Sequence, residues 1–295
     1  MTMDNALAMR QLTVRRDSFT LKDVDLQVPS GYVTGVVGPN GAGKTTLLKT
    51  ALGLLTPRSG EVTVLGHPAG SKEVQDRIGV VLDRATVAPE WRVGTIGRRI
   101  GRLYRRWDEQ QYRGFVDRFG IPLRNRVDAL SRGQAVKLSI AIALAHNPEI
   151  LILDEPTSGL DPVSRRDLAD VIREFMVDPA HTTVFSTHIT SELDDLADRI
   201  IVLNAGTVVF DGMLHDLHEK YVMARGPAPL PASARAVAIG ARFDSQGGYE
   251  ALIRIEDTAK FGQDAVIEEA STDDVVIHFA GHSQAKPFLG SEAAA

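Results

Sequence analysis

Hydrophobic and polar residues alternate along the first part of the chain, and the spacing becomes helical after a glycine-rich segment. The run from Phe19 to Val28 alternates apolar and polar positions, which is typical of a half-buried strand. A short β-rich run at 32–37 then meets the glycine-rich segment 38–43, and apolar residues recur at helical spacing over 44–54. The pattern therefore predicts a strand, a glycine loop and a helix in direct succession.

Continuous apolar runs further along the chain predict a sheet that is covered on both faces. Residues 150–153 form such a run and are predicted as a strand, and 183–186 are predicted as a second strand. The segment 200–209 is predicted as a hairpin, because turn residues at 204–206 separate two β-rich runs. Helical patterns lie between the strands, among them 135–145, so the expected fold class is α/β.

The composition changes after residue 220, where small residues alternate with prolines. We therefore predict a main domain over residues 1–219 and three C-terminal parts. These are a linker at 220–235, a small accessory domain at 236–281 and a flexible tail at 282–295. Within the accessory domain, three runs predict strands and a fourth fits either a helix or a strand: 236–243, 250–255, 265–269 and 273–279. This accessory domain is therefore expected to be of the α+β type.

The overall composition is that of a folded protein without thiol chemistry. Of 295 residues, 43% are hydrophobic and 24% are charged, which is typical of globular domains. There is no cysteine, so disulfide frameworks, thiolate metal sites and thiol nucleophiles are excluded. The net charge of -5 gives no bulk attraction for nucleic acid or an anionic membrane. No stretch reaches the roughly 18 apolar residues that cross a bilayer, so we expect membrane association only through a partner.

One region departs from the acidic average of the chain. Residues 92–132 contain eleven arginines, no lysine and four acidic residues. Apolar residues at helical spacing predict one amphipathic helix with the arginines outward: Ile96, Ile100, Leu103, Tyr104 and Trp107. Three interpretations are open: a solvated helix, a face toward a membrane permease or the anionic inner leaflet, or a nucleic-acid contact.

Residues 38–45 match the pattern G-x-x-x-x-G-K-[ST], in which backbone N–H groups curl around an anion. The helix that follows directs its positive dipole end at the same anion. Lys44 is predicted to reach the β- and γ-phosphates of a nucleotide, Thr45 to bind Mg²⁺, and Thr46 to contact a further phosphate. The candidate nucleotide contacts here are Gly38, Pro39, Asn40, Gly41, Ala42, Gly43, Lys44, Thr45 and Thr46. The alternative is a glycine-rich turn that only enters a helix.

Two carboxylates, Asp154 and Glu155, directly follow the apolar run 150–153. Sheets of the α/β class place ligand chemistry at the carboxyl ends of their strands. Two acids at the end of a buried strand are costly unless a cation meets them. Asp154 is therefore a candidate Mg²⁺ ligand, and Glu155 is the candidate general base for a water that attacks the γ-phosphate. A solvated strand end is the alternative.

Three further segments accompany these two motifs in a fixed order: Leu130–Gln134, Pro156–Asp161 and Ser186–His188. Ser131 is suited to cap the helix expected at 135–145, and Gly133 permits the close approach of an anion. Taken together over about residues 7–219, the five motifs resemble the nucleotide-binding subunits of ABC transporters.

The resemblance implies the ABC-type P-loop NTPase fold, in which a β-sheet core carries a helical subdomain, here at about 84–147, and ATP and Mg²⁺ are the ligands. It also implies a head-to-tail dimer. In such a dimer, Ser131, Gly133 and Gln134 of one subunit close over ATP that is bound to residues 38–46 of the other. One chain therefore holds two half-sites.

The resemblance further assigns roles around the γ-phosphate. Ser158–Asp161 would be the loop that links the two sites across the dimer. His188 would contact the γ-phosphate and orient the water. A single histidine after a strand is more often structural, but its place within this set of motifs favours the functional role. The catalytic candidates are thus Lys44, Glu155 and His188.

Two positions depart from the family pattern. Asp83 stands where the family usually carries a glutamine that senses Mg²⁺ and the attacking water, so the candidate metal ligands are Thr45, Asp154 and Asp83. The aromatic residue expected near Arg16 to stack on adenine is missing, so either Arg16 stacks through its guanidinium plane or Phe19 substitutes.

Further segments resemble the two-component exporters of drugs or peptide antibiotics in Gram-positive bacteria: Tyr104–Asp108, Phe119–Leu123 and Phe185–Ser191. This resemblance implies an ATPase subunit that drives a separate membrane permease from the cytoplasmic face of the membrane. It implies a homodimer, or a dimer with a related ATPase subunit, and no nucleic-acid partner. The rival hypothesis is a soluble ABC-type ATPase that serves as a regulatory or assembly module without a permease.

Overall fold

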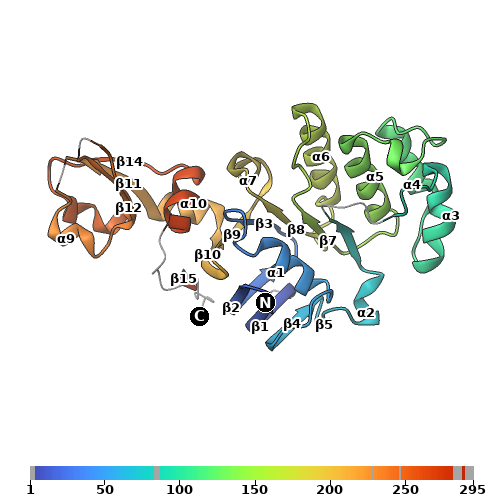
Figure 1. The fold of residues 1–295 in the computed structure, drawn as a ribbon, viewed down its shortest axis with the longest axis horizontal. Coiled ribbons are helices and arrows are strands. Elements are labelled where there is room, and N and C mark those ends of the chain that lie inside the picture. The colour runs from blue at the N-terminus through green and yellow to red at the C-terminus, as the bar shows by residue number, and fades with distance from the viewer. Residues whose placement is uncertain (1–3, 83–86, 228, 246, 282–287, 290–295) are drawn as a thin grey trace.

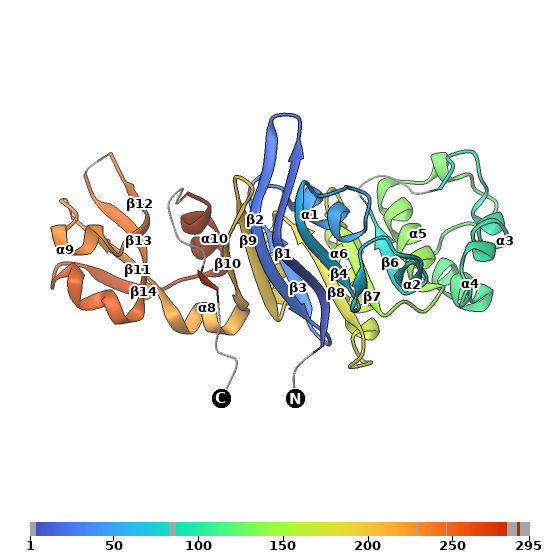
Figure 2. The same cartoon turned by 90° about the horizontal axis from the view of Figure 1, so that it is seen from below.

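The structure is a computed structural model that describes residues 4–82, 87–227, 229–245, 247–281 and 288–289. These residues form three sheets with helices around them (Figure 1). Two of the sheets lie at the centre, and a helical subdomain and the third sheet lie at opposite ends in both views (Figures 1 and 2). The described part of the chain is therefore elongated.

The two central sheets share one hydrophobic core. The first is antiparallel with the order β2-β1-β4-β5: β1 Asn5–Arg16, β2 Phe19–Pro29, β4 Ser59–Val64 and β5 His67–Pro68. The second has the order β15-β10-β9-β3-β8-β7-β6: β3 Val33–Val37, β6 Ile78–Val81, β7 Ile150–Asp154, β8 Thr182–Thr187, β9 Arg199–Asn204, β10 Thr207–Met213 and β15 Phe288–Leu289. Strands β9, β3, β8, β7 and β6 run parallel, and β10 is antiparallel to β9.

The strands predicted from the apolar pattern are present. β2, β3, β7 and β8 occupy the expected positions, and β9 and β10 form the expected hairpin. Val36 and Ile152 pack into the core shared with the first sheet, whereas Leu153 and Phe185 pack into the core on the opposite face. The parallel sheet is thus covered on both faces, as continuous apolar runs require.

Helices border the parallel sheet and also form a separate subdomain between β6 and β7. Those along the sheet are α1 Lys44–Ala51, α2 Lys72–Gln75, α6 Pro162–Phe175, α7 Thr190–Leu196 and α8 Leu214–Lys220. Those of the subdomain are α3 Ile96–Ile100, α4 Glu109–Arg118 and α5 Arg132–Leu144, with 3₁₀ turns at Val93–Thr95, Gly101–Leu103 and Val127–Ala129. The subdomain has its own core around the buried residues Tyr112 and Leu138. The helix expected at 135–145 is confirmed as α5.

One predicted helix is wrong. The spacing of apolar residues over 96–107 predicts one amphipathic helix, but α3 ends at Ile100 and a 3₁₀ turn follows. The ring of Trp107 folds back onto this turn, where a Cβ on Gly101 would lie only 2.7 Å from the ring. As a result Leu103 is 75% exposed and does not contribute to a buried helix face. Packing of the tryptophan on a glycine therefore overrides the helical pattern.

The third sheet corrects the prediction of a linker at 220–235. Its order is β12-β13-β11-β14: β11 Tyr221–Gly226, β12 Ile239–Phe243, β13 Tyr249–Arg254 and β14 Val266–Glu269. β11 is an inner strand, paired with β13 and β14, and a short helix, α9 Ala232–Arg235, lies further along the same stretch. The linker prediction is wrong because the apolar run Tyr221–Ala224, which is buried, directly precedes the prolines that dominated the composition.

The last helix, α10 Thr272–Gly281, joins the third sheet to the main domain. It packs against β12 of the third sheet and against α7 and β9 of the main domain. A 3₁₀ turn at Ile255–Phe261 packs against α9, β11 and β13. Val275 and Phe279 belong to the same buried cluster as Phe210 of β10, so the accessory part and the main domain share a core.

The last described residues lie beside the main sheet. Within the predicted flexible tail 282–295, the described residues Phe288–Leu289 form β15, which pairs in parallel with β10, and the others lie outside the described residues. Among the described residues, no helix has the length and apolar character needed to cross a membrane.

Candidate functional site

The glycine loop at 38–43 connects β3 to α1 and requires glycine for steric reasons at two positions. A Cβ on Gly38 would lie 2.2 Å from the carbonyl oxygen of Leu203. Gly43 caps α1 with a φ of 112°, and a Cβ there would lie 2.7 Å from the ring of Phe19. The chain can therefore curl tightly at the start of α1, where unpaired backbone N–H groups and the helix dipole favour an anion.

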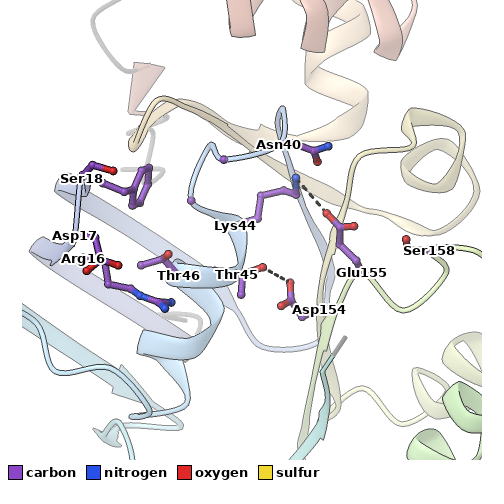
Figure 3. A pocket seen from close by; sticks show the side chains of 13 residues that line it. Arg16, Asp17, Ser18, Asn40, Lys44, Thr45, Thr46, Asp154, Glu155 and Ser158 are labelled. Carbon is purple, nitrogen blue, oxygen red and sulfur yellow. Dashed lines mark hydrogen bonds and ion pairs between the residues drawn. The ribbon is translucent and has the colours of Figure 1, made fainter. Parts of the chain in front are cut away.

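Lys44, the first residue of α1, lies within the curl of the loop and is 4% exposed. Its Nζ donates to the carbonyl oxygens of Gly38 at 2.8 Å and Pro39 at 3.4 Å. The same atom lies 3.4 Å from Oε1 of Glu155 (Figure 3). The ammonium group of Lys44 therefore lies at the centre of the loop, close to a carboxylate at the end of β7.

Asp154, the last residue of β7, is held by two hydroxyl groups and is 2% exposed. Its Oδ1 accepts hydrogen bonds from Oγ1 of Thr45 at 3.0 Å and from Oγ of Ser186 at 2.8 Å. Because β7 and β8 run parallel with Asp154 opposite Ser186, the pairing of these two strands fixes the carboxylate beside the loop. Ser186 was not predicted as a site residue.

Glu155 turns away from β7 in a left-handed conformation, with a φ of 47°. Its N–H donates to Oγ of Ser186 at 2.9 Å, so one serine holds both acids. Its Oε2 lies 3.2 Å from Nδ1 of His188, which is the first residue after β8. A left-handed residue other than glycine is strained, and such strain is concentrated at functional sites.

A cavity of about 640 Å³ opens beside these groups. It is lined by Arg16, Asp17, Ser18, Phe19, Asn40, Gly41, Gly43, Lys44, Thr45, Thr46, Asp154, Glu155 and Ser158. In Figure 3 the lysine and the two acids lie on one side of it, and Arg16–Ser18 of the β1–β2 hairpin lie on the other. The ring of Phe19 packs on the loop at Gly43, whereas Arg16 is exposed at the cavity. The size and the mixed charges suit a nucleoside triphosphate.

Ser131, Gly133 and Gln134 are not among the residues that line this cavity. They lie at the start of α5, where Oγ of Ser131 accepts from N–H of Gln134, and Oε1 of Gln134 accepts from N–H of Ser131, both at 3.2 Å. The loop 158–161 lies beside them, because a Cβ on Gly159 would be 3.1 Å from the guanidinium of Arg132. The structure thus places the predicted contacts of one chain in two separate surfaces.

The candidate metal ligands are only partly described. Thr45 and Asp154 lie together, whereas Asp83 lies outside the described residues. Among the residues that are described, no group of three or more histidine and acidic side chains could hold a metal ion. Two oxygen donors beside a phosphate loop nevertheless fit Mg²⁺, which takes most of its ligands from water and substrate phosphates.

Comparison with known proteins adds the family to this geometry. Residues 21–158 match the family model described as ABC transporter. The daunorubicin/doxorubicin resistance ATP-binding protein DrrA of Streptomyces peucetius is 33% identical over 290 residues, which cover 88% of this chain and 87% of that protein. An uncharacterized ABC transporter ATP-binding protein of Bacillus subtilis, YdbJ, is 32% identical over 192 residues, which cover 64% of this chain and 62% of that protein.

A solved structure of the ATP binding subunit of an ABC transporter has the same fold, with a TM-score of 0.66 at 24% identity over 72% of this chain and 92% of that one. The parallel sheet, the phosphate loop and the acids after β7 together define an ABC-type P-loop ATPase fold. The chain belongs to the ABC transporter ATP-binding proteins. Members of this family bind ATP, generally with Mg²⁺, and their ATP-binding domains are ATPases in general.

Proposed function

We propose that this chain hydrolyses ATP as the nucleotide-binding subunit of a membrane export complex, in which closure of two subunits around ATP drives a separate permease. The observation that carries the proposal is the convergence of Lys44, Asp154 and Glu155 on one cavity at the phosphate loop. The name of the Streptomyces peucetius relative refers to drug resistance, which supports an export role.

The loop and the first turn of α1 bind the phosphates. Backbone N–H groups of residues 38–46 and the ammonium of Lys44 meet the negative charge of the β- and γ-phosphates. Thr45 and Asp154 would hold Mg²⁺, which would supply positive charge at the phosphates. On the opposite side of the cavity, Arg16 stacks on the adenine through its guanidinium plane, because Phe19 is already packed on the loop.

Glu155 is the general base. Its carboxylate lies between the ammonium of Lys44 and the imidazole of His188, so it is held at the γ-phosphate end of the cavity. Oε2 accepts the proton of the attacking water, and His188 contacts the γ-phosphate and orients that water. The hydrogen bond from the Glu155 N–H to Ser186 maintains the strained turn that directs the carboxylate into the site.

The second half of each site comes from another copy of the chain or from a related ATPase subunit. The surface formed by Ser131, Gly133 and Gln134 is separate from the cavity of its own chain, as a head-to-tail dimer requires. In the dimer, Ser131 of the partner subunit closes over the ATP that is bound to residues 38–46.

The proposal is tested by isolating the tagged chain from detergent-solubilised membranes of its host, with ATP hydrolysis measured on the purified chain and on the complex. We expect recovery of a protein with several hydrophobic spans, and stimulation of hydrolysis by that protein. Recovery of soluble partners only, with hydrolysis intact, would instead support the regulatory or assembly ATPase. A purified chain that binds no ATP and hydrolyses none would contradict both.

A further inference from the structure

Helix α7 directly follows the loop that carries His188. β8 ends at Thr187, and α7 begins at Thr190, so any movement of α7 is transmitted to His188 within two residues. Oγ1 of Thr187 donates to Oε2 of Glu192 at 2.6 Å and accepts from the N–H of Ile189 at 2.9 Å. These two hydrogen bonds join the loop to the first turn of α7. The position of α7 is therefore linked to the backbone position of His188.

The contacts of α7 within the main domain leave part of it unsupported. Leu193 packs tightly on β3, where a Cβ on Gly35 would lie 2.3 Å from its Cδ2 atom. Glu192 is 8% exposed, and its Oε1 is buried with no hydrogen-bond partner among the residues that the structure describes. Near the end of α7, Arg173 of α6 donates to the carbonyl oxygen of Asp195 at 3.2 Å, and Leu196 packs on the main core. The less supported part of α7 is therefore its first turn, around Glu192.

The first turn of α10 supplies additional contacts to both ends of α7. Oγ1 of Thr272 donates to Oδ1 of Asp194 at 2.5 Å and also lies 3.2 Å from Nε2 of His218 in α8. Oγ1 of Thr190 donates to Oδ1 of Asp273 at 3.1 Å. Thr272 is 2% exposed, so its hydrogen bond is shielded from water. Val275 and Leu193 are buried in one cluster behind these hydrogen bonds. α10 therefore holds α7 by hydrogen bonds and by apolar packing.

The last turn of α10 contacts the end of β9, which lies beside the phosphate loop. Nδ2 of Asn204 donates to the carbonyl oxygen of Ala280 at 2.5 Å. Asn204 follows Leu203, whose carbonyl oxygen lies against Gly38 at the start of the phosphate loop. One helix of the C-terminal part thus contacts the helix that follows His188 and the strand end that supports the loop (Figure 1).

We propose that α10 positions His188 through α7, and that Thr272 is the positioning residue on which this contact depends. The C-terminal part thereby sets the hydrolytic rate of the nucleotide site in its own chain, although none of its described residues lines the cavity. This inference rests on the proposed role of His188 at the γ-phosphate.

The first test is the variant Thr272→Val, which keeps the shape of the side chain and removes the hydroxyl. We expect kcat for ATP hydrolysis to fall about tenfold while KM for ATP stays within about twofold, because phosphate binding is left intact. Thr272→Ser keeps the hydroxyl and should restore the rate. Ser233→Ala is the matched control, because it removes a hydrogen bond from Ser233 Oγ to the Lys260 carbonyl that lies within the C-terminal part and does not involve α7.

A second measurement does not depend on catalysis. Amide hydrogen exchange over residues 188–196 should be faster in Thr272→Val than in the wild type, and unchanged in Thr272→Ser and Ser233→Ala. Unchanged exchange over 188–196 in Thr272→Val would overturn the proposal even if the wild type hydrolysed no ATP. An unchanged kcat in Thr272→Val would also overturn the proposal. So would a change of kcat, KM and Tm together in that variant, because it would indicate general destabilisation.

Discussion

The phosphate-loop cavity and the start of α5 are both built around the beginning of a helix, yet they differ in how their polar groups are satisfied. At the cavity, Lys44 from the start of α1 meets Asp154 and Glu155 from the end of β7, so unlike charges lie together. At α5, Ser131 and Gln134 satisfy each other through reciprocal hydrogen bonds. The first surface gathers a lysine and two acids around a cavity, whereas the second is a preformed helix start that carries one charged side chain, the exposed Arg132.

The largest expected effect is at the cavity. Glu155→Gln removes the proton acceptor but keeps the shape and most hydrogen bonds of the side chain, so ATP hydrolysis should fall about 10²–10⁴-fold with ATP binding retained. Lys44→Ala should abolish binding as well, because the loop loses its central cation. Both are measured by phosphate release and by equilibrium binding of ATP. Equal activity of Glu155→Gln and the wild type would remove Glu155 from the mechanism.

The next prediction joins the two surfaces. Ser131→Arg should bind ATP but not hydrolyse it, because a large cation blocks the edge that closes over the nucleotide. If each site uses both surfaces from different chains, an equal mixture of Ser131→Arg and Lys44→Ala should recover about a quarter of the wild-type rate. Half of the dimers are then mixed, and each mixed dimer has one intact site out of two.

The mixture is compared with each variant alone at the same total concentration. No recovery in a mixture that demonstrably forms dimers would mean that one chain builds a complete site. Activity of Ser131→Arg alone would mean that the start of α5 is not used.

The two regions also differ in how far the sequence predicts them. The phosphate loop is local: glycine spacing, a lysine and helical periodicity lie within a few residues, and they predict the strand, loop and helix that the structure contains. The contact of Ser186 with both acids depends on the register of β7 against β8, which lie about 30 residues apart in the chain, and no local pattern encodes that register. The same holds for β11 and for the end of α3, where pairing and a tryptophan contact override local composition.

Ser186 provides the third prediction. Ser186→Ala leaves Oδ1 of Asp154 with one donor and the N–H of Glu155 with no acceptor, so we expect kcat to fall about tenfold and the free energy of unfolding to fall by about 1–3 kcal/mol. Steady-state kinetics and urea unfolding measure the two effects. Ser139→Ala is the control, because that hydroxyl bonds to the Ala135 carbonyl within α5 and away from the acids. A loss of kcat as large in Ser139→Ala would refute the specific role of Ser186.

The smallest expected effect is on thermal stability. It concerns the attachment of the subdomain that carries Ser131 to the core. His146 follows α5, is 1% exposed, and donates from Nε2 to the carbonyl oxygen of Ile78 in β6 at 3.1 Å. Its ring stacks on Tyr104, and Nδ1 is buried with no hydrogen-bond partner in the described part of the chain. A second proton on the ring would therefore place a full positive charge in a buried site.

Burial lowers the pKa of His146 below its usual value, although the hydrogen bond to Ile78 acts in the opposite direction. Below the unfolded pKa of about 6.5, the unfolded chain binds a proton that the folded chain excludes, so stability falls as the pH decreases toward the folded pKa. His146→Gln retains a donor for Ile78 and cannot titrate, so it should lose less stability than the wild type between pH 7.5 and 5.5, by about 2 °C in Tm. Thermal unfolding at the two pH values measures this difference. Parallel pH profiles for the two proteins would show that the attachment of α5 to the core does not depend on the protonation of His146.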